Sequence, residues 1–236
     1  MLYESIGKYA QAEPLCVRSL AISEEQLGAN HPDTATSLNN LAMLYKSIGK
    51  YDQVEPLYVR SLAIREEQLG ANHPATATSL NNLAMLYELI GKYAEAEPLY
   101  VRSLAIREEQ LGANHPTTAT SLNNLAGLYR LIGKYAEAEP LHVRSLAIIE
   151  EQLGANHPHT ANSLNNLAGL YEFIGKYAQA EPLLTRAVEI LEQSLGNNHP
   201  NTQGCRNKLQ ILRQQLVKPK MNRKESRLET IKKLGA

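Results

Sequence analysis

The dipeptide His-Pro occurs five times at a fixed spacing, and histidine is a common metal ligand and proton carrier in proteins. The five histidines stand 42 residues apart: His31, His73, His115, His157 and His199. Zinc needs its ligands to converge within about 2.0–2.3 Å of one ion, whereas stacked helical repeats place equivalent residues roughly 10 Å apart. We therefore predict no metal site, and we interpret the histidines as markers of a repeat.

Other residues with reactive side chains form no catalytic pattern. His142 and His159 are single substitutions within the repeat, and neither has a serine or cysteine nucleophile with a carboxylate partner. The glycines are isolated rather than clustered, so no phosphate-binding loop is predicted. The pair Glu66-Glu67 predicts a solvated helix face, with Arg65 nearby for ordinary surface pairing. The sequence thus predicts a protein that is not an enzyme and that uses no cofactor.

Composition excludes several partner classes. The chain has 236 residues, 24 basic and 24 acidic side chains and 43% apolar residues, so no strong field would recruit nucleic acid or a membrane. Cys16 and Cys205 lie in dissimilar contexts, which does not support a disulfide framework and favours the cytoplasm. The chain contains no apolar stretch near 18 residues, and its start lacks the pattern of a signal peptide. We expect a cytoplasmic protein without membrane insertion.

Each 42-residue period contains two helical patterns. Residues 33–48 carry apolar side chains at steps of three and four, which predicts an amphipathic helix that Gly49 ends. Residues 51–69 carry a second pattern, closed by Gly70. Pro56 lies inside this second helix, but the apolar pattern continues through it in phase. We therefore expect a continuous helix with a slight bend.

The segment LNNLAMLYKSIGKYDQVEPLYVRSLAI resembles a tetratricopeptide repeat. It has a small residue, Ala42, after the second leucine of the first helix, a tyrosine one turn later, Tyr45, and the pair Gly49 and Tyr51 at the turn. The 42-residue form, with its recurring LNNLA, GKY-x-x-AEPL and LG-x-x-HP, resembles the repeats of kinesin light chains and of related bacterial proteins. The resemblance covers about residues 1–216.

This resemblance implies an all-α fold, a right-handed superhelical solenoid of antiparallel helix pairs. The first helix of each pair, here called helix A, would line a concave groove that holds a peptide or protein segment, and the second is called helix B. The expected array consists of a partial repeat at 1–28, full repeats at about 29–70, 71–112, 113–154 and 155–196, and a capping helix at about 200–216. Residues 217–236 are basic and are expected to form a flexible tail.

A polar stripe opposite the packed face of helix A is expected to point away from the core and toward a ligand. Asparagine amides both donate and accept hydrogen bonds, so a ladder of asparagines is expected to clamp the backbone of an extended peptide. This first ladder is Asn39, Asn81, Asn123 and Asn165. A second ladder, which either shares that role or bonds to the neighbouring repeat, is Asn40, Asn82, Asn124 and Asn166. The alternative is that both ladders only tie helices together.

The same stripe holds the positions that vary most between repeats. They are Met43, Met85, Gly127 and Gly169; Lys46, Glu88, Arg130 and Glu172; and Ser47, Leu89, Leu131 and Phe173. Such variation favours partner recognition, with neutral drift on a solvated face as the alternative. The charges alternate, so the groove is not uniformly basic. We expect an apolar anchor of the ligand near Leu131 and Phe173, because the two glycines leave room there.

The two ends differ from the middle. Helix B at 9–27 presents Leu15, Leu20 and Ile22, and only residues 1–6 of a helix A precede it. We expect an open apolar surface there that forms a homodimer or meets another repeat. At the other end polar residues replace the apolar pattern after His199, which predicts a polar cap.

The predicted function is a protein-interaction scaffold. Two alternatives are a regulatory or sensor segment of a larger signalling protein and a self-assembling structural module.

Overall fold

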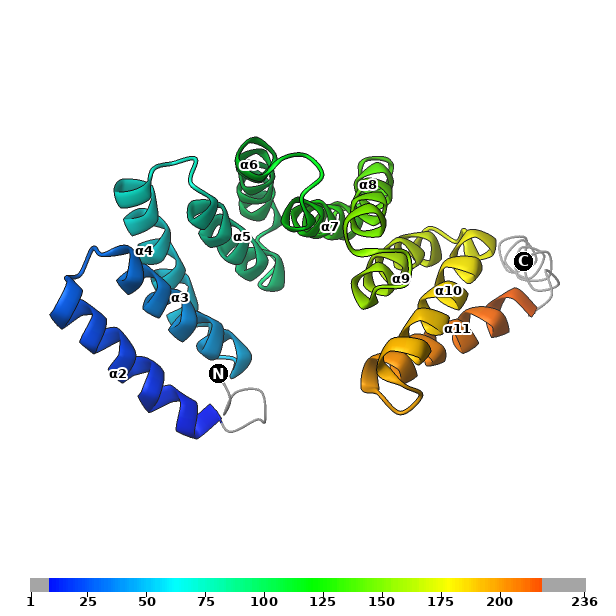
Figure 1. Ribbon diagram of the computed structural model, residues 1–236, viewed down its shortest axis with the longest axis horizontal. Helices are drawn as coiled ribbons and strands as arrows, with labels where there is room; N and C mark the ends of the chain where they lie inside the picture. Colours follow the sequence, from blue (N-terminus) through cyan, green and yellow to red (C-terminus); the bar gives the residue numbers. More distant parts are fainter. Residues whose placement is uncertain (1–8, 218–236) are drawn as a thin grey trace, which may run out of the picture. The chain divides into compact units, whose positions relative to one another are not determined.

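The protein is described by a computed structural model that covers residues 9–217 (Figure 1). The stub at 1–6 and the expected basic tail from residue 218 onward lie outside the described residues. Within 9–217 every regular element is an α-helix, which confirms the predicted all-α class. The helices are α2 (Tyr9–Leu27), α3 (Pro32–Ser47), α4 (Tyr51–Leu69), α5 (Pro74–Leu89), α6 (Tyr93–Leu111), α7 (Pro116–Leu131), α8 (Tyr135–Leu153), α9 (Pro158–Phe173), α10 (Tyr177–Leu195) and α11 (Pro200–Val217).

The recurring histidines are helix N-caps. His31 has extended backbone angles (φ −76°, ψ 144°), and its Nδ1 accepts a hydrogen bond from the backbone N–H of Asp33 at 3.1 Å. The same bond recurs at the other four histidines. Pro32 follows as the first helical residue, where its missing N–H costs nothing. The His-Pro dipeptide therefore starts each helix A, and the capping role of its histidine was not expected from the sequence pattern.

Glycine ends both kinds of helix. Gly49 has φ +79° and Gly70 has φ +99°, a region that side chains with a Cβ rarely adopt. Between these two points α4 runs without interruption through Pro56, which confirms the expected continuous helix B.

The described chain falls into two compact parts, with the division inside α8. In the N-terminal part (1–148) each helix packs on the next, from α2 on α3 to α6 on α7 (Figure 1). Its core joins consecutive repeats, since one cluster contains Tyr45 of α3, Tyr58 of α4 and Leu86 of α5. Part of the apolar surface of each repeat is therefore buried only because the next repeat packs against it, as in other stacked repeats.

In the C-terminal part (149–236) α9 packs on α10 and α10 packs on α11 (Figure 1). Leu164 and Leu170 of α9, Leu184 of α10 and Leu212 of α11 are at most 1% exposed. The apolar positions of α11 that face inward are therefore filled as in the other helices A.

Two kinds of arginine link successive repeats. Arg102 Nη1 contacts Glu66 Oε1 at 2.5 Å, an ion pair between neighbouring helices B that recurs along the chain. Arg65 behaves differently: it is only 7% exposed, and its Nη1 donates to Ser79 Oγ and to the carbonyl of Ala75, both at 3.0 Å. The expectation of surface pairing for Arg65 is wrong, because the next helix A covers its guanidinium group.

Candidate functional site

The first asparagine ladder is not fully outward-facing. Asn39 and Asn81 are 8% and 6% exposed, so the expectation that they point away from the core is wrong. Asn39 Oδ1 accepts a hydrogen bond from Asn82 at 2.9 Å, and Asn81 Oδ1 accepts one from Asn124 at 2.8 Å. Consecutive helices A lie close enough to cover these amides, as the contact between α5 and α7 indicates.

The second ladder supplies the donors of these bonds. Asn82 and Asn124 therefore bond to the neighbouring repeat, one of the two roles expected for them. The amide groups of the first ladder also approach methionine sulfur: Asn81 Nδ2 lies 3.4 Å from Met85 Sδ. Sulfur is a weak acceptor, so these contacts are weaker than the hydrogen bonds between asparagines.

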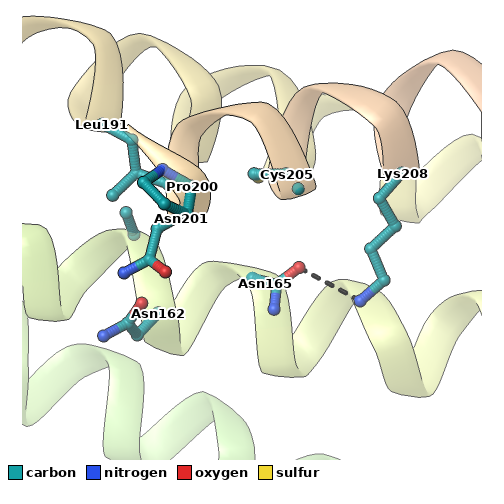
Figure 2. Close-up of a pocket in the computed structure, with 9 residues that line it drawn as sticks. Asn162, Asn165, Leu191, Pro200, Asn201, Cys205 and Lys208 are labelled. Atoms are coloured by element: carbon teal, nitrogen blue, oxygen red, sulfur yellow. Dashed lines mark hydrogen bonds between the residues drawn. The ribbon is translucent and has the colours of Figure 1, made fainter. Parts of the chain in front are cut away.

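In the C-terminal part a lysine takes the place of the donor asparagine. Lys208 of α11 donates from Nζ to Asn165 Oδ1 of α9 at 3.1 Å, across a pocket of about 330 Å³ (Figure 2). Figure 2 shows Asn162 of α9 and Asn201 of α11 on the same side of this pocket, away from Lys208. The lining consists of Ala161, Asn162, Asn165, Leu191, Pro200, Asn201, Gly204, Cys205 and Lys208. The polar lining of this pocket therefore consists mainly of side-chain amides and one cation.

Cys205 is not a nucleophile candidate. Its side chain is buried at the pocket, and burial raises the pKa of the thiol, with Lys208 acting in the opposite direction. A thiol with a raised pKa stays protonated at neutral pH and reacts slowly. The thiol of Cys205 is therefore not activated for covalent chemistry.

Apolar side chains of helix A stay exposed along the variable stripe. In the N-terminal part Met43 and Met85 are each 37% exposed, Leu89 is 54% exposed and Leu131 is 44% exposed. In the C-terminal part Phe173 is 59% exposed. Other apolar residues of these helices, such as Leu38 and Leu80, are buried. A Cβ at Gly127 would meet nothing within 4 Å, so the space expected there is open, whereas a Cβ at Gly169 would lie 3.5 Å from Lys208 Nζ, which takes part of the space expected at that glycine.

The charged residues of the stripe are partly buried. Burial lowers the pKa of Lys46, and Glu88 accepts a hydrogen bond from the hydroxyl of Tyr100 at 2.8 Å. Arg130 holds the next equivalent position. In the C-terminal part burial raises the pKa of Glu172, with Lys208 acting in the opposite direction. The charged side chains therefore lie in different local environments, and their signs alternate along the stripe.

His142 occupies a buried position that tyrosine holds in the two preceding repeats. It is 2% exposed, and its Nδ1 lies 2.8 Å from Asn123 Oδ1, so the ring nitrogen donates. Burial, with the charge of Arg130 as a second cause, lowers the pKa of His142 to about 4. The imidazole is neutral at pH 7 and ties helix B to helix A.

Within residues 9–217 no group of three or more His, Cys, Asp or Glu side chains is placed to hold a metal ion. Over the same residues no helix is both long and apolar enough to cross a membrane.

Of the amide and charged side chains that line this pocket, only Asn165 was predicted as a site residue, and Asn162, Asn201 and Lys208 were not. The signal available for the lysine was its departure from the repeat, since it stands where Asn40, Asn82 and Asn124 stand earlier. Asn162 departs in the same way, because the equivalent residues are threonines such as Thr36.

The chain belongs to the tetratricopeptide repeat family. The family's sequence profile, described as Tetratricopeptide repeat, matches residues 1–67, 49–109, 76–148 and 117–193. Tetratricopeptide repeats generally mediate protein–protein interaction or scaffolding, and such scaffolds are typically not enzymes. None of the curated proteins compared with this chain matches it significantly.

Solved structures similar to this chain are of the kinesin light chain type. One is a predicted kinesin light chain of Podosopora anserina with nearly identical TPR-like repeats: a form of it with one substitution is 28% identical with a TM-score of 0.70, covering 82% of this chain and 91% of that chain. A second structure of this protein is 29% identical, with a TM-score of 0.68 and coverage of 81% and 91%. BtubC (BKLC) from P. vanneervenii is 28% identical, with a TM-score of 0.71 and coverage of 84% and 79%.

Proposed function

We propose that the protein is an interaction scaffold whose helix-A surface binds an extended or helical segment of a partner protein, and that it acts by binding rather than by catalysis. One observation carries this proposal. Met43, Met85, Leu89 and Leu131 remain exposed on helices whose other apolar side chains are buried. Exposed apolar side chains lined up on a rigid scaffold favour contact with a partner over contact with water.

The asparagine ladders contribute to this surface in a second way. Asn39 and Asn81 are buried, and their side-chain carbonyls accept hydrogen bonds from the neighbouring repeat, so they contribute by joining consecutive helices A beneath this surface. In the C-terminal part the pocket beside Lys208 would accept a polar group of the ligand, and Phe173 would contact an apolar one. Each part of the chain thus offers its own contacts.

The class of partner follows from charge and chemistry. Equal numbers of basic and acidic residues favour a protein ligand over nucleic acid. We also propose a cytoplasmic location, which is supported by Cys16 and Cys205 being thiols rather than half-cystines.

The test begins with a random peptide library selected on the full chain. The affinity of a selected peptide is then measured for the double variant Leu89→Ser/Leu131→Ser and for the matched double control Val59→Ser/Val101→Ser. Val59 and Val101 lie on helices B and are each 45% exposed, close to Leu131 at 44%. We expect affinity at least tenfold weaker for the helix-A variant, from about 1.4 kcal/mol of lost apolar contact, and less than twofold weaker for the control. Failure to select any peptide, or equal losses in both variants, would contradict the proposal.

A further inference from the structure

An apolar face of α2 is more exposed than the equivalent face of every other described helix B. Ile22 is 49% exposed, whereas its equivalents Ile64, Ile106, Ile148 and Ile190 are each 3% exposed. Leu15 is 53% exposed, and its equivalent Leu57 is only partly exposed. Because the residue types are unchanged, the difference arises from a neighbour that α2 lacks among the described residues.

The interior repeats identify the missing neighbour. Ile64 packs against Ala35 and Leu38 of α3, the helix A of its own repeat. Ile106 packs in the same way against the alanine and leucine of α5. The same pair of residues therefore covers the isoleucine in both repeats: an alanine and a leucine three positions apart on a helix A.

A hydrogen bond defines the same neighbour independently. Ser61 Oγ donates to the carbonyl of Ala35 at 2.8 Å, and Ser61 is fully buried. The bond recurs at 2.8 Å from Ser103 and from Ser145 to the equivalent alanine carbonyls. In α2 the equivalent residue, Ser19, is exposed. It places a hydroxyl where the backbone of a helix A would lie, and only a small residue such as alanine allows so close an approach.

We propose that Leu15, Ser19 and Ile22, together called the α2 face, form a docking site for an amphipathic helix of the helix-A type, which presents alanine and leucine three positions apart. Leu20, which the sequence had placed on this surface, is not part of it. It lies partly buried against the cluster of Ala35, Leu38 and Ile64.

A second copy of the chain fits less well as the occupant. A second copy of the chain could offer α11, but Gln203 and Arg206 stand there at the places of Ala35 and Leu38. Arg206 is also engaged with Glu192 at 2.5 Å. The remaining described helices A of a second copy use their alanine and leucine internally.

The probe is a labelled peptide with the sequence of residues 72–91, which contains α5 and its alanine and leucine. Binding to the full chain is measured by fluorescence anisotropy. We expect at least tenfold weaker binding to Ile22→Ser than to the unaltered chain, and less than twofold weaker binding to Val17→Ser. Val17 is the matched control, since it is 44% exposed and its equivalents Val59, Val101 and Val143 stay 45%, 45% and 46% exposed where a helix A is present. A control peptide with Ala77→Asp and Leu80→Asp should not bind.

A second measurement covers the case in which the isolated peptide fails to form a helix. The sequence of residues 72–85 is joined ahead of Leu2, which completes a helix A in register with the existing chain. Amide exchange in α2 should then slow at least tenfold, with little change in α6.

The proposal would be overturned by unchanged exchange in α2 of the extended chain. It would also be overturned by peptide binding that Ile22→Ser and Val17→Ser weaken equally. A third contrary result is a dimer of the unextended chain that Ile22→Ser dissociates and that does not bind the peptide, because a second copy would then be the occupant.

Discussion

The two ends of the described chain differ in the residues on their outward faces: polar in α11 and apolar in α2. An interior helix A is covered by helix B at four positions, Ala35, Leu38, Ala42 and Tyr45, all at most 8% exposed. In α11 these positions are Gln203, Arg206, Gln210 and Arg213. At the other end α2 keeps the isoleucine of the interior helices B and leaves it 49% exposed.

The difference teaches how a repeat array can be closed without loss of its inner packing. The inward residues Leu209 and Leu212 of α11 are 6% and 1% exposed, as in any other helix A. Only the outward face has changed, and Arg213 donates from Nε to Glu181 Oε1 at 2.8 Å. A polar outer face is what a terminal repeat needs in water. The helix α11 has such a face, whereas the equivalent isoleucine of α2 is exposed and apolar.

The largest effect should come from placing the arginine of α11 at the equivalent position of an interior helix A. Leu38→Arg places a charge at a site that is 1% exposed, and we expect a loss of about 4 kcal/mol or more in unfolding free energy. The reverse change, Arg206→Leu, removes a partly exposed ion pair and should cost no more than about 1 kcal/mol. Urea denaturation followed by circular dichroism measures both. Similar losses of unfolding free energy in the two variants would contradict the difference described between an interior helix A and α11.

A slightly smaller effect separates the two isoleucines. Ile64→Ser leaves a cavity and a hydroxyl in the core, and we expect a loss of about 3 kcal/mol. Ile22→Ser should cost less than about 1 kcal/mol, because half of this side chain is already in water. The same denaturation experiment distinguishes them. A large loss at Ile22 would mean that the α2 face is covered in the isolated chain.

A fall in pH should lower the free energy of unfolding through protonation of His142. Its pKa is lowered from 6.5 to about 4 in the folded protein, so the unfolded chain binds the proton first as the pH falls. The neutral ring's stabilisation is present above about pH 6.5 and is lost between pH 6.5 and pH 4, by up to roughly 3 kcal/mol. His142→Tyr, which restores the residue type of Tyr100, should remove this part of the pH dependence. An unchanged pH profile in that variant would exclude His142 as its source.

The smallest effect compares two asparagines of the second ladder. Asn82→Ala leaves the buried carbonyl of Asn39 without its donor, and we expect a loss of about 1–2 kcal/mol. Asn40 holds the same place in α3, the first described helix A, and Asn40→Ala should cost about 0.5 kcal/mol or less. Thermal denaturation of the two variants is the measurement. Equal costs would mean that the bond between helices A adds no stability.

The sequence alone determined the features that depend on local pattern. The steps of three and four fixed helices A and B, glycine fixed their ends, and the continuous pattern through Pro56 correctly predicted one helix rather than two. The 42-residue period also led to the family, because several separate motifs recur in register. The capping role of the histidines is also a local feature, because the cap hydrogen bond joins residues two positions apart.

Tertiary structure decided whatever depends on the neighbouring repeat. Asn39, Arg65 and His142 have polar side chains, and their helical positions did not show that another helix covers them. Their partners lie many residues away, as Asn82 does from Asn39, so the helical period contains no signal for the contact. Ile22 and Ile64 are the clearest case: residue type and helical phase are the same, and only the presence of a covering helix separates an exposed side chain from a buried one.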